Sequence, residues 1–184
     1  MTFDDHEHLE RDPLIDQLLI PSAAIQRRVS ELGREISAEY RETIPILVSI
    51  LKGGVVFHAD LMRRLSVLHE IDFLSVSSYD GGTQSTGVVK ILKDLGNSIT
   101  GRDVLLVEDI VDTGLTLQYL REILHARHPN SLKVCTLLNK VDARKVDVPL
   151  DYVGFDIPNE FVIGYGLDYD EKYRHLPFIG VMKG

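Results

Sequence analysis

The sequence predicts an α/β fold in which helices flank a mostly parallel central sheet. Two stretches lead to this prediction, residues 46–65 and residues 104–124. Each begins with a short branched apolar run, passes through a small polar turn and continues with apolar residues at helical spacing. Such runs are typical of strands buried on both faces of a parallel sheet. Ligands bind at the carboxyl ends of parallel strands, so both turns are expected in a functional site.

The remaining elements follow from the same patterns along the chain. Apolar residues at helical spacing predict a helix over residues 22–40, with Ser22 as its N-cap. Further helices are expected over residues 55–65 and after the turn near residue 116. The predicted strands are residues 46–51, 71–79, 88–92, 104–107 and 132–138, followed by short strands and turns over residues 152–182. The first dozen residues lack periodicity and are expected to be frayed.

Composition places the chain among ordinary globular proteins. Its 184 residues are 44% hydrophobic and 26% charged, which predicts one domain over residues 1–184 with a substantial core. No apolar run approaches the length of about 20 residues that spans a bilayer, and the first residues do not resemble a signal peptide. We therefore expect a cytoplasmic protein with no membrane partner. The single cysteine, Cys135, lies in an apolar run and is expected to be a buried, inert thiol.

The net charge of −8 bears on possible partners. It argues against a general nucleic-acid surface. It does not exclude a polyanionic small molecule, provided that Mg²⁺ and a few well-placed cations gather at the site.

The turn after residues 104–107 has the chemistry of a phosphate site. Gly114 lets successive N–H groups point at one place, and the start of a helix adds partial positive charge. Thr113 and Thr116 add hydroxyl donors. Glu108 and Asp109 are expected where the strand ends, and such adjacent acids can hold a hard cation or the hydroxyls of a sugar. Together these groups predict a site for a sugar phosphate and Mg²⁺.

The simpler alternative is an ordinary helix start with surface acids, capped by Asp112 or Thr113. The whole stretch, VLLVEDIVDTGLT over residues 104–116, favours the functional interpretation. It resembles the phosphoribosyl pyrophosphate signature of the type I phosphoribosyltransferases, whose members transfer a phosphoribosyl group to a nitrogen of a base. Leu115 stands where some relatives have lysine, so phosphate binding would depend on backbone amides and the threonine hydroxyls. The residues that the resemblance assigns to the phosphoribosyl group are Glu108, Asp109, Asp112, Thr113, Gly114, Leu115 and Thr116.

A second anion site is expected after residues 46–51. Paired glycines allow a close backbone approach, and the ammonium group of Lys52 can meet a phosphate, although the pair could equally form a simple tight turn. L-K-G-G after a branched strand resembles the pyrophosphate-binding loop of the family. The resemblance implies that Lys52 and Gly53 bind pyrophosphate and that a cis peptide lies near Leu51–Lys52.

The segment between residues 79 and 88 has two interpretations. Its glycine pair could make a hairpin turn between two strands. It is also long and rich in Ser, Thr and Gly, which suits a mobile lid. Ser78 and Tyr79, with residues 85–87, resemble the flexible loop of the purine-salvage branch, which closes over the site and excludes water.

The end of the chain indicates the base. Lys140 at a strand end could simply be solvated, Phe161 could be core, and Arg174 could form a surface ion pair. The run FVIGYGLDYDEKYR resembles the closing signature of hypoxanthine-guanine phosphoribosyltransferases. The resemblance implies that Lys140 meets the oxygen of a 6-oxopurine, Phe161 stacks on the ring and the Val162 backbone binds its edge. It also assigns Arg174 to pyrophosphate, Glu108 and Asp109 to Mg²⁺, and Asp168 to a second Mg²⁺ site.

These resemblances imply a type I phosphoribosyltransferase fold with a small hood formed by the terminal segments. The expected reaction converts hypoxanthine or guanine and phosphoribosyl pyrophosphate to IMP or GMP and pyrophosphate. Asp112 is the expected general acid/base.

Other functions stay open. The fold would also suit a non-catalytic regulator that binds phosphoribosyl pyrophosphate, or transfer to another base such as xanthine, uracil, adenine or orotate. A P-loop phosphotransferase is disfavoured, because no G-x-x-x-x-G-K-[ST] occurs. We expect a homodimer or homotetramer, since apolar residues on the early helices would suit subunit contacts, although they would equally suit a monomer's core.

Overall fold

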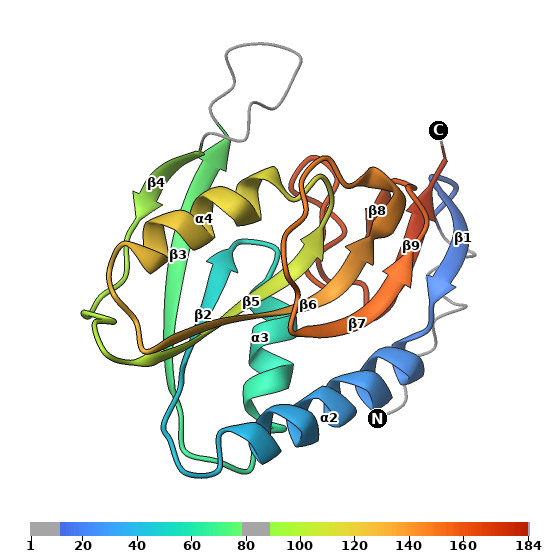
Figure 1. Ribbon diagram of the computed structural model, residues 1–184. Helices are drawn as coiled ribbons and strands as arrows, with labels where there is room; N and C mark the ends of the chain where they lie inside the picture. Colours follow the sequence, from blue (N-terminus) through green and yellow to red (C-terminus); the bar gives the residue numbers. More distant parts are fainter. Residues whose placement is uncertain (1–11, 79–88, 184) are drawn as a thin grey trace.

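A computed structural model of the chain describes residues 12–78 and 89–183. Its main feature is a six-stranded sheet in which β4 alone runs antiparallel to its neighbour. This arrangement confirms the predicted α/β fold with a mostly parallel sheet (Figure 1). In spatial order the strands are β4 (Val89–Lys93), β3 (Glu70–Ser78), β2 (Ile46–Leu51), β5 (Asp103–Val111), β6 (Ser131–Lys140) and β7 (Tyr152–Ile157).

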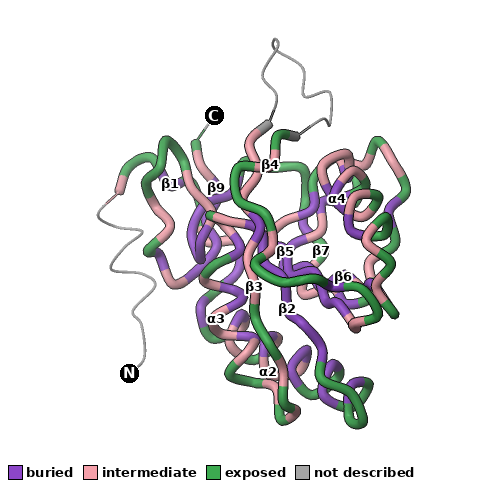
Figure 2. Tube along the Cα trace, turned by 90° about the vertical axis from the view of Figure 1, so that its left-hand side faces the viewer, coloured by how far each residue is buried: buried purple, intermediate pink, exposed green. Residues whose placement is uncertain are grey.

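The two predicted strand-turn-helix stretches lie side by side. β2 pairs with β5 in parallel, with Ile46 opposite Val104 and Ser49 opposite Val107. The buried residues of both strands run through the middle of the molecule (Figure 2). Because the strands share direction and register, the turns that follow them emerge at the same carboxyl edge of the sheet.

Helices cover both faces of this sheet (Figure 1). α2 (Ser22–Glu39) and α3 (Val55–Met62) pack on one face, where Leu105 and Val107 of β5 join the same core cluster. α4 (Leu115–His125) packs on the other face with the intervening residues of β5, Val104 and Leu106. The apolar stripe of α2 is wholly buried in the core of the chain, so it is not left over for subunit contacts.

A second, three-stranded sheet forms the expected hood. β1 (Ile15–Ile20) pairs with β9 (Ile179–Met182), and β9 pairs with β8 (Val162–Ile163), all antiparallel. The hood therefore joins segments from the two ends of the described chain. The strand β1 was not predicted, because its pairing partner lies at the far end of the sequence.

Several expected boundaries are wrong. Ser22 is the first residue of α2 and Pro21 is its N-cap. α3 ends at Met62 rather than at residue 65. Just after its end, the N–H of Arg64 donates to the carbonyl of Leu61 and closes a tighter, 3₁₀-type turn. β6 extends to Lys140, and a short 3₁₀ helix, η1 (Val141–Ala143), follows it.

β3 and β4 form the antiparallel pair expected of a hairpin. Tyr79 and residues 85–87 of the expected lid, and the first eleven residues, lie outside the described residues. Cys135 is buried and unpaired, as predicted, and burial raises the pKa of its thiol. In the described part of the chain no helix is long and apolar enough to cross a membrane.

Candidate active site

The strand β5 continues through the two acids instead of ending before them. It reaches Val111 because Glu108, Ile110 and Val111 pair with β6. Successive side chains of a strand point to opposite faces. Glu108 therefore continues the face that α4 covers, and Asp109 continues the face that α3 covers. The expectation that both carboxylates follow the strand end as one group is corrected by this alternation.

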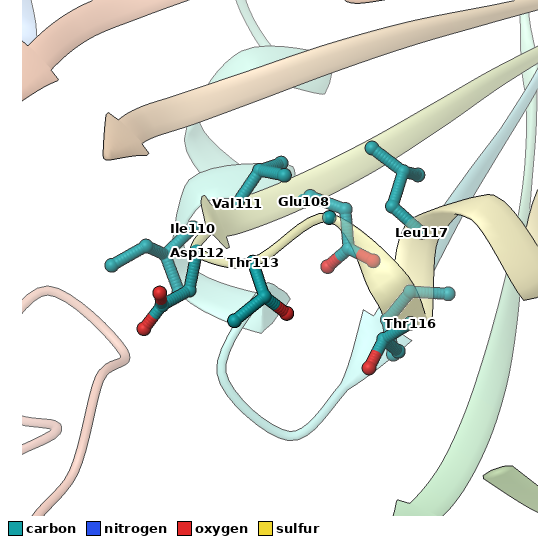
Figure 3. A pocket seen from close by; sticks show the side chains of 9 residues that line it. Glu108, Ile110, Val111, Asp112, Thr113, Thr116 and Leu117 are labelled. Atoms are coloured by element: carbon teal, nitrogen blue, oxygen red, sulfur yellow. The ribbon is translucent and has the colours of Figure 1, made fainter. Parts of the chain in front are cut away.

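Each carboxylate faces a different segment. Glu108 lines a cavity in front of α4 (Figure 3). Asp109 lies against the turn after β2, where a Cβ built on Gly53 would come within 1.8 Å of its Oδ2 atom. The two acids thus connect two neighbouring parts of the carboxyl edge.

Burial gives this acid pair unusual electrostatics. It raises the pKa of Glu108 well above the ordinary value, and the charge of Asp109 raises it further. Burial also raises the pKa of Asp109 to about 6, although the Ile110 N–H at 2.9 Å and the charge of Arg174 favour its ionised form. Such a pair favours a neighbouring cation, and perturbed carboxylates of this kind are common in active sites.

The cavity in front of α4 has a volume of about 190 Å³ and is formed mainly by the turn after β5. Gly114 is the N-cap of α4, in place of Asp112 or Thr113, and has a left-handed φ of 83° that favours glycine. The hydroxyl oxygen of Thr113 accepts a hydrogen bond from the Leu115 N–H at 3.4 Å. The cavity is lined by Ile50, Glu108, Ile110, Val111, Asp112, Thr113, Gly114, Thr116 and Leu117.

This turn can bind an anion. The first N–H groups of α4 lack partners within the helix, and the helix dipole adds partial positive charge there. The labelled hydroxyls of Thr113 and Thr116 lie on the same turn (Figure 3). The geometry therefore brings together the donors that the sequence indicated for a phosphate.

A segment that sequence reasoning missed supports the turn from behind. The N–H of Lys145 donates to the Thr113 carbonyl at 3.0 Å. A Cβ on Gly114 would lie 3.1 Å from Val146 and 3.2 Å from Nη1 of Arg144. Nη1 of Arg144 is buried and has no hydrogen-bond partner among the described residues, while its Nη2 atom donates to Asn139. Nothing in the local sequence distinguishes these residues from an ordinary polar loop.

The turn after β2 depends on close packing. The Leu51–Lys52 peptide is cis, as the family resemblance implied. Gly53 lies directly against Asp109, and a Cβ on Gly54 would come within 2.6 Å of the Ser49 hydroxyl. These glycines are therefore required by the space around them.

The segment of residues 164–176 docks on this turn. A Cβ on Gly166 would come within 2.2 Å of the Gly53 carbonyl oxygen. Arg174 donates to the Gly166 carbonyl at 2.8 Å, and its Nη2 atom lies 2.8 Å from Oδ1 of Asp168. Lys52 forms an ion pair with Glu171 at 2.9 Å. The predicted residues Lys52, Gly53, Asp168 and Arg174 are thus brought together beside Asp109.

The residues expected at a base come from two places, Lys140 from the end of β6 and the other two from the start of the hood strand β8. Lys140 is buried rather than solvated, and its Nζ atom donates to Oδ2 of Asp112 at 3.3 Å. Phe161 is 54% exposed, so it is not a core residue. Its ring stands edge-on to the ring of Tyr169, with 5.8 Å between the ring centroids. Val162, the first residue of β8, is buried. An exposed ring suits stacking on a planar ligand, and a buried ammonium donor suits an oxygen acceptor.

The acids fit Mg²⁺ only if a ligand completes its coordination. Among the described residues no group of three His, Cys, Asp or Glu side chains could hold a metal ion. Asp168 lies close enough to Asp109 for its charge to raise the pKa of the Asp109 carboxyl. Glu108 instead faces the cavity in front of α4. Mg²⁺ is usually bound through one or two carboxylates together with phosphate oxygens and waters. The donor set suits that arrangement.

Comparisons with known proteins agree with this geometry. The family profile described as "Phosphoribosyl transferase domain" matches residues 18–170. The chain belongs to the phosphoribosyltransferase family. Within this family it is 50% identical to the hypoxanthine-guanine phosphoribosyltransferase of Bacillus subtilis over 169 residues, which are 92% of this chain and 94% of the relative. It is 52% identical to the hypoxanthine phosphoribosyltransferase of Escherichia coli over 166 residues, 89% of this chain and 93% of the relative.

Solved phosphoribosyltransferase structures are similar as well. A hypoxanthine phosphoribosyltransferase from Staphylococcus aureus gives a TM-score of 0.90 at 48% identity, over 92% of each chain. A hypoxanthine-guanine phosphoribosyltransferase from Bacillus anthracis gives 0.89 at 46% identity, over 92% of this chain and 99% of the other.

The packing at Gly53 predicts the effect of adding one methyl group. Gly53→Ala would force Asp109 or the turn to move, and we expect a loss of about 1–3 kcal/mol in the free energy of unfolding. Chemical denaturation measures this loss. Gly96→Ala is the matched control, because its Cβ would meet nothing closer than Asp72 at 3.7 Å. Equal stability of the two variants would contradict the close contact.

The raised pKa of Asp109 predicts a pH-dependent stability. The unfolded carboxyl titrates near 3.8 and the folded one near 6, so the folded state keeps its proton longer. Stability should therefore fall as pH rises from about 4 to about 6 and stay reduced above that range. Asp109→Asn removes this penalty, and we expect the variant to gain about 1–3 kcal/mol relative to the wild type across that interval.

Thermal and chemical unfolding at several pH values, with a chelator to remove divalent cations, measures the gain. Asp170→Asn, at an exposed acid, should follow the wild type. If the free energies of unfolding of Asp109→Asn and the wild type differed by the same amount at every pH, ionisation of Asp109 would not destabilise the folded protein, and the prediction would fail.

Proposed function

We propose that this protein transfers the phosphoribosyl group of phosphoribosyl pyrophosphate to hypoxanthine or guanine. The products are IMP or GMP and pyrophosphate. The observation that carries the proposal is the meeting of three segments at one sheet edge: the turn after β5, the Lys52 turn, and the loop of residues 164–176. The similarity to relatives named for these two bases supports the choice of substrate.

The phosphoribosyl part of the substrate would span both faces of β5. The turn of residues 112–116, including Leu115, binds the 5′-phosphate through its N–H groups and hydroxyls. Glu108 and Asp109 hold the ribose hydroxyls and the cation beside them. Lys52, Gly53 and Arg174 bind the pyrophosphate group on the α3 side.

The purine would lie between the sheet edge and the hood. The exposed ring of Phe161 offers a stacking surface, and the backbone of Val162 contacts the edge of the base. The ammonium group of Lys140 can donate hydrogen bonds but cannot accept them. It therefore prefers the oxygen of a 6-oxopurine to the amino group of adenine.

Asp112 is the residue we assign to proton transfer. N9 of the purine attacks C1′ of the ribose, the bond from C1′ to pyrophosphate breaks, and the proton on N7 passes to the Asp112 carboxylate. The Asp112 side chain is 51% exposed and is held by Lys140, so it can reach a bound base while keeping a fixed orientation. Lys52 and Arg174 stabilise the charge on the departing pyrophosphate.

Mg²⁺ is the cofactor that this proposal requires. Asp109 and Asp168 on one face of β5, and Glu108 on the other, are the residues that would hold Mg²⁺ at two separate positions together with substrate oxygens. When bound, it neutralises the pyrophosphate and makes it a better leaving group.

Turnover with a panel of bases tests the function. With phosphoribosyl pyrophosphate and Mg²⁺, we expect nucleotide from hypoxanthine or guanine and little from adenine or uracil. Asp112→Asn should lower turnover by about 10²-fold or more while nucleotide still binds. The assay measures nucleotide formation for each base offered separately, with xanthine included.

Two results would overturn parts of this proposal. Undiminished turnover by Asp112→Asn would remove that residue from proton transfer. Binding of phosphoribosyl pyrophosphate without reaction of any base would favour a ligand-responsive regulator instead of an enzyme.

We also propose that the protein forms a homodimer or homotetramer. The exposed apolar side chains Leu68, Ile71 and Leu92 would suit contacts with another copy. Light scattering of the purified protein should then give two or four times the 20.7 kDa of one chain. A mass of 20.7 kDa at micromolar concentration would contradict the proposal.

A further inference from the structure

A carboxylate of the chain itself lies between the two cations that we assign to pyrophosphate. Oε1 of Glu171 is 2.9 Å from Nζ of Lys52, and its Oε2 is 3.2 Å from Nη2 of Arg174. The two cations come from segments far apart in the sequence. Glu171 therefore bridges them with one oxygen each, in the manner of an anionic ligand.

The backbone around Glu171 holds this carboxylate in place. Its N–H donates to Oδ2 of Asp168 at 2.9 Å. Asp170, Glu171 and Tyr173 have φ values of 51°, 61° and 74°, a left-handed conformation that residues other than glycine rarely adopt. A turn that keeps three such residues together presents the Glu171 side chain toward Lys52.

The bridge is ionic and can open. Hydrogen bonds from Lys52 and then Arg174 lower the pKa of Glu171, so its carboxylate is charged at neutral pH. The side chains of Lys52 and Glu171 are 66% and 64% exposed, so water can replace either partner. Ion pairs at this exposure are weak, and a ligand with more charge can displace Glu171.

Arg174 does not depend on Glu171 for its position. Its Nη1 atom donates to the Gly166 carbonyl at 2.8 Å, and Nη2 also pairs with Asp168 at 2.8 Å. The guanidinium therefore keeps its orientation after Glu171 moves away. A site prepared in this way can accept another anion without rearrangement of Arg174.

We propose that Glu171 is an internal competitor for the pyrophosphate subsite. This inference rests on the proposed function, in which Lys52 and Arg174 bind pyrophosphate. An incoming pyrophosphate group takes both cations from Glu171, and the carboxylate returns to them when pyrophosphate departs. Glu171 thus weakens pyrophosphate binding and assists its release, and it acts on this subsite rather than on the purine.

Removing the charge of Glu171 tests the proposal. Glu171→Gln keeps the shape of the side chain and the backbone N–H that Asp168 binds. We expect the variant to bind pyrophosphate about three- to tenfold more tightly in the presence of Mg²⁺, since two weak ion pairs no longer compete. Calorimetric titration measures this affinity, and stopped-flow measurement should show slower pyrophosphate release. The KM for hypoxanthine should stay unchanged.

Asp170→Asn is the matched control. Asp170 is the adjacent acid, it is 78% exposed, and it pairs with Lys172 rather than with Lys52 or Arg174. Asparagine tolerates the left-handed backbone there. This variant removes the same charge from the same turn, so we expect its pyrophosphate affinity to stay within about twofold of the wild type.

The possible outcomes separate this inference from the proposed function. Equal or weaker pyrophosphate binding by Glu171→Gln, with normal binding by the wild type, would overturn the competitor role alone. Tighter binding by both variants would show a general charge effect and would overturn it as well. If the wild type bound no pyrophosphate, the assignment of the subsite would fail, and this inference with it.

Discussion

The parallel pairing of β2 with β5 is the constraint on which the site depends. It places the Lys52 turn and the turn before α4 at the same edge, although about 60 residues separate them in the sequence. The paired residues of the two strands are buried and, apart from Ser49, apolar, so sliding one strand past the other would expose core residues and move one turn away from the other. The contact of Gly53 with Asp109 then holds the turn after β2 directly against the end of β5. A larger residue at position 53 would displace the Asp109 carboxylate or the turn and so disrupt the site.

Alternation along β5 gives the site its two halves. Glu108 faces the cavity before α4, and Asp109 faces the turn before α3. Each half therefore has one acid beside one helix N-terminus, with Glu108 buried and Asp109 half-buried, and β5 lies between them. A ligand with phosphate groups at both ends of a sugar matches this division, because each end reaches a separate set of N–H donors while the sugar lies over the acids. The raised pKa values of the two acids are consistent with a site whose charges are balanced by a ligand and a cation rather than by the protein.

The strands and turns that depend on neighbouring residues could be predicted from the sequence. The features of the fold and site that depend on contacts between distant segments could not. The strand β2 is a short run that is apolar except for Ser49, and the turn before α4 is defined by its own glycine and threonines, so both were predicted. The continuation of β5 past Glu108 was missed because acids are uncommon in strands, while pairing with β6 overrides that preference. β1 and the support of Gly114 by Arg144 were missed because each depends on a segment that the sequence does not place nearby. The ion pair of Lys52 with Glu171 also joins distant segments.

The three cations that we assign to ligand binding have one property in common: each already has an anionic partner from the chain. Lys140 pairs with Asp112, Lys52 with Glu171, and Arg174 with Asp168 and Glu171. Ligand binding is then an exchange of partners, in which the gain from each new contact is reduced by the loss of an existing one. This exchange limits affinity, and it also keeps the cations oriented while no ligand is bound. A transferase must release pyrophosphate after each reaction. Weaker binding of pyrophosphate, by cations that keep their orientation, therefore allows faster turnover than tight binding would.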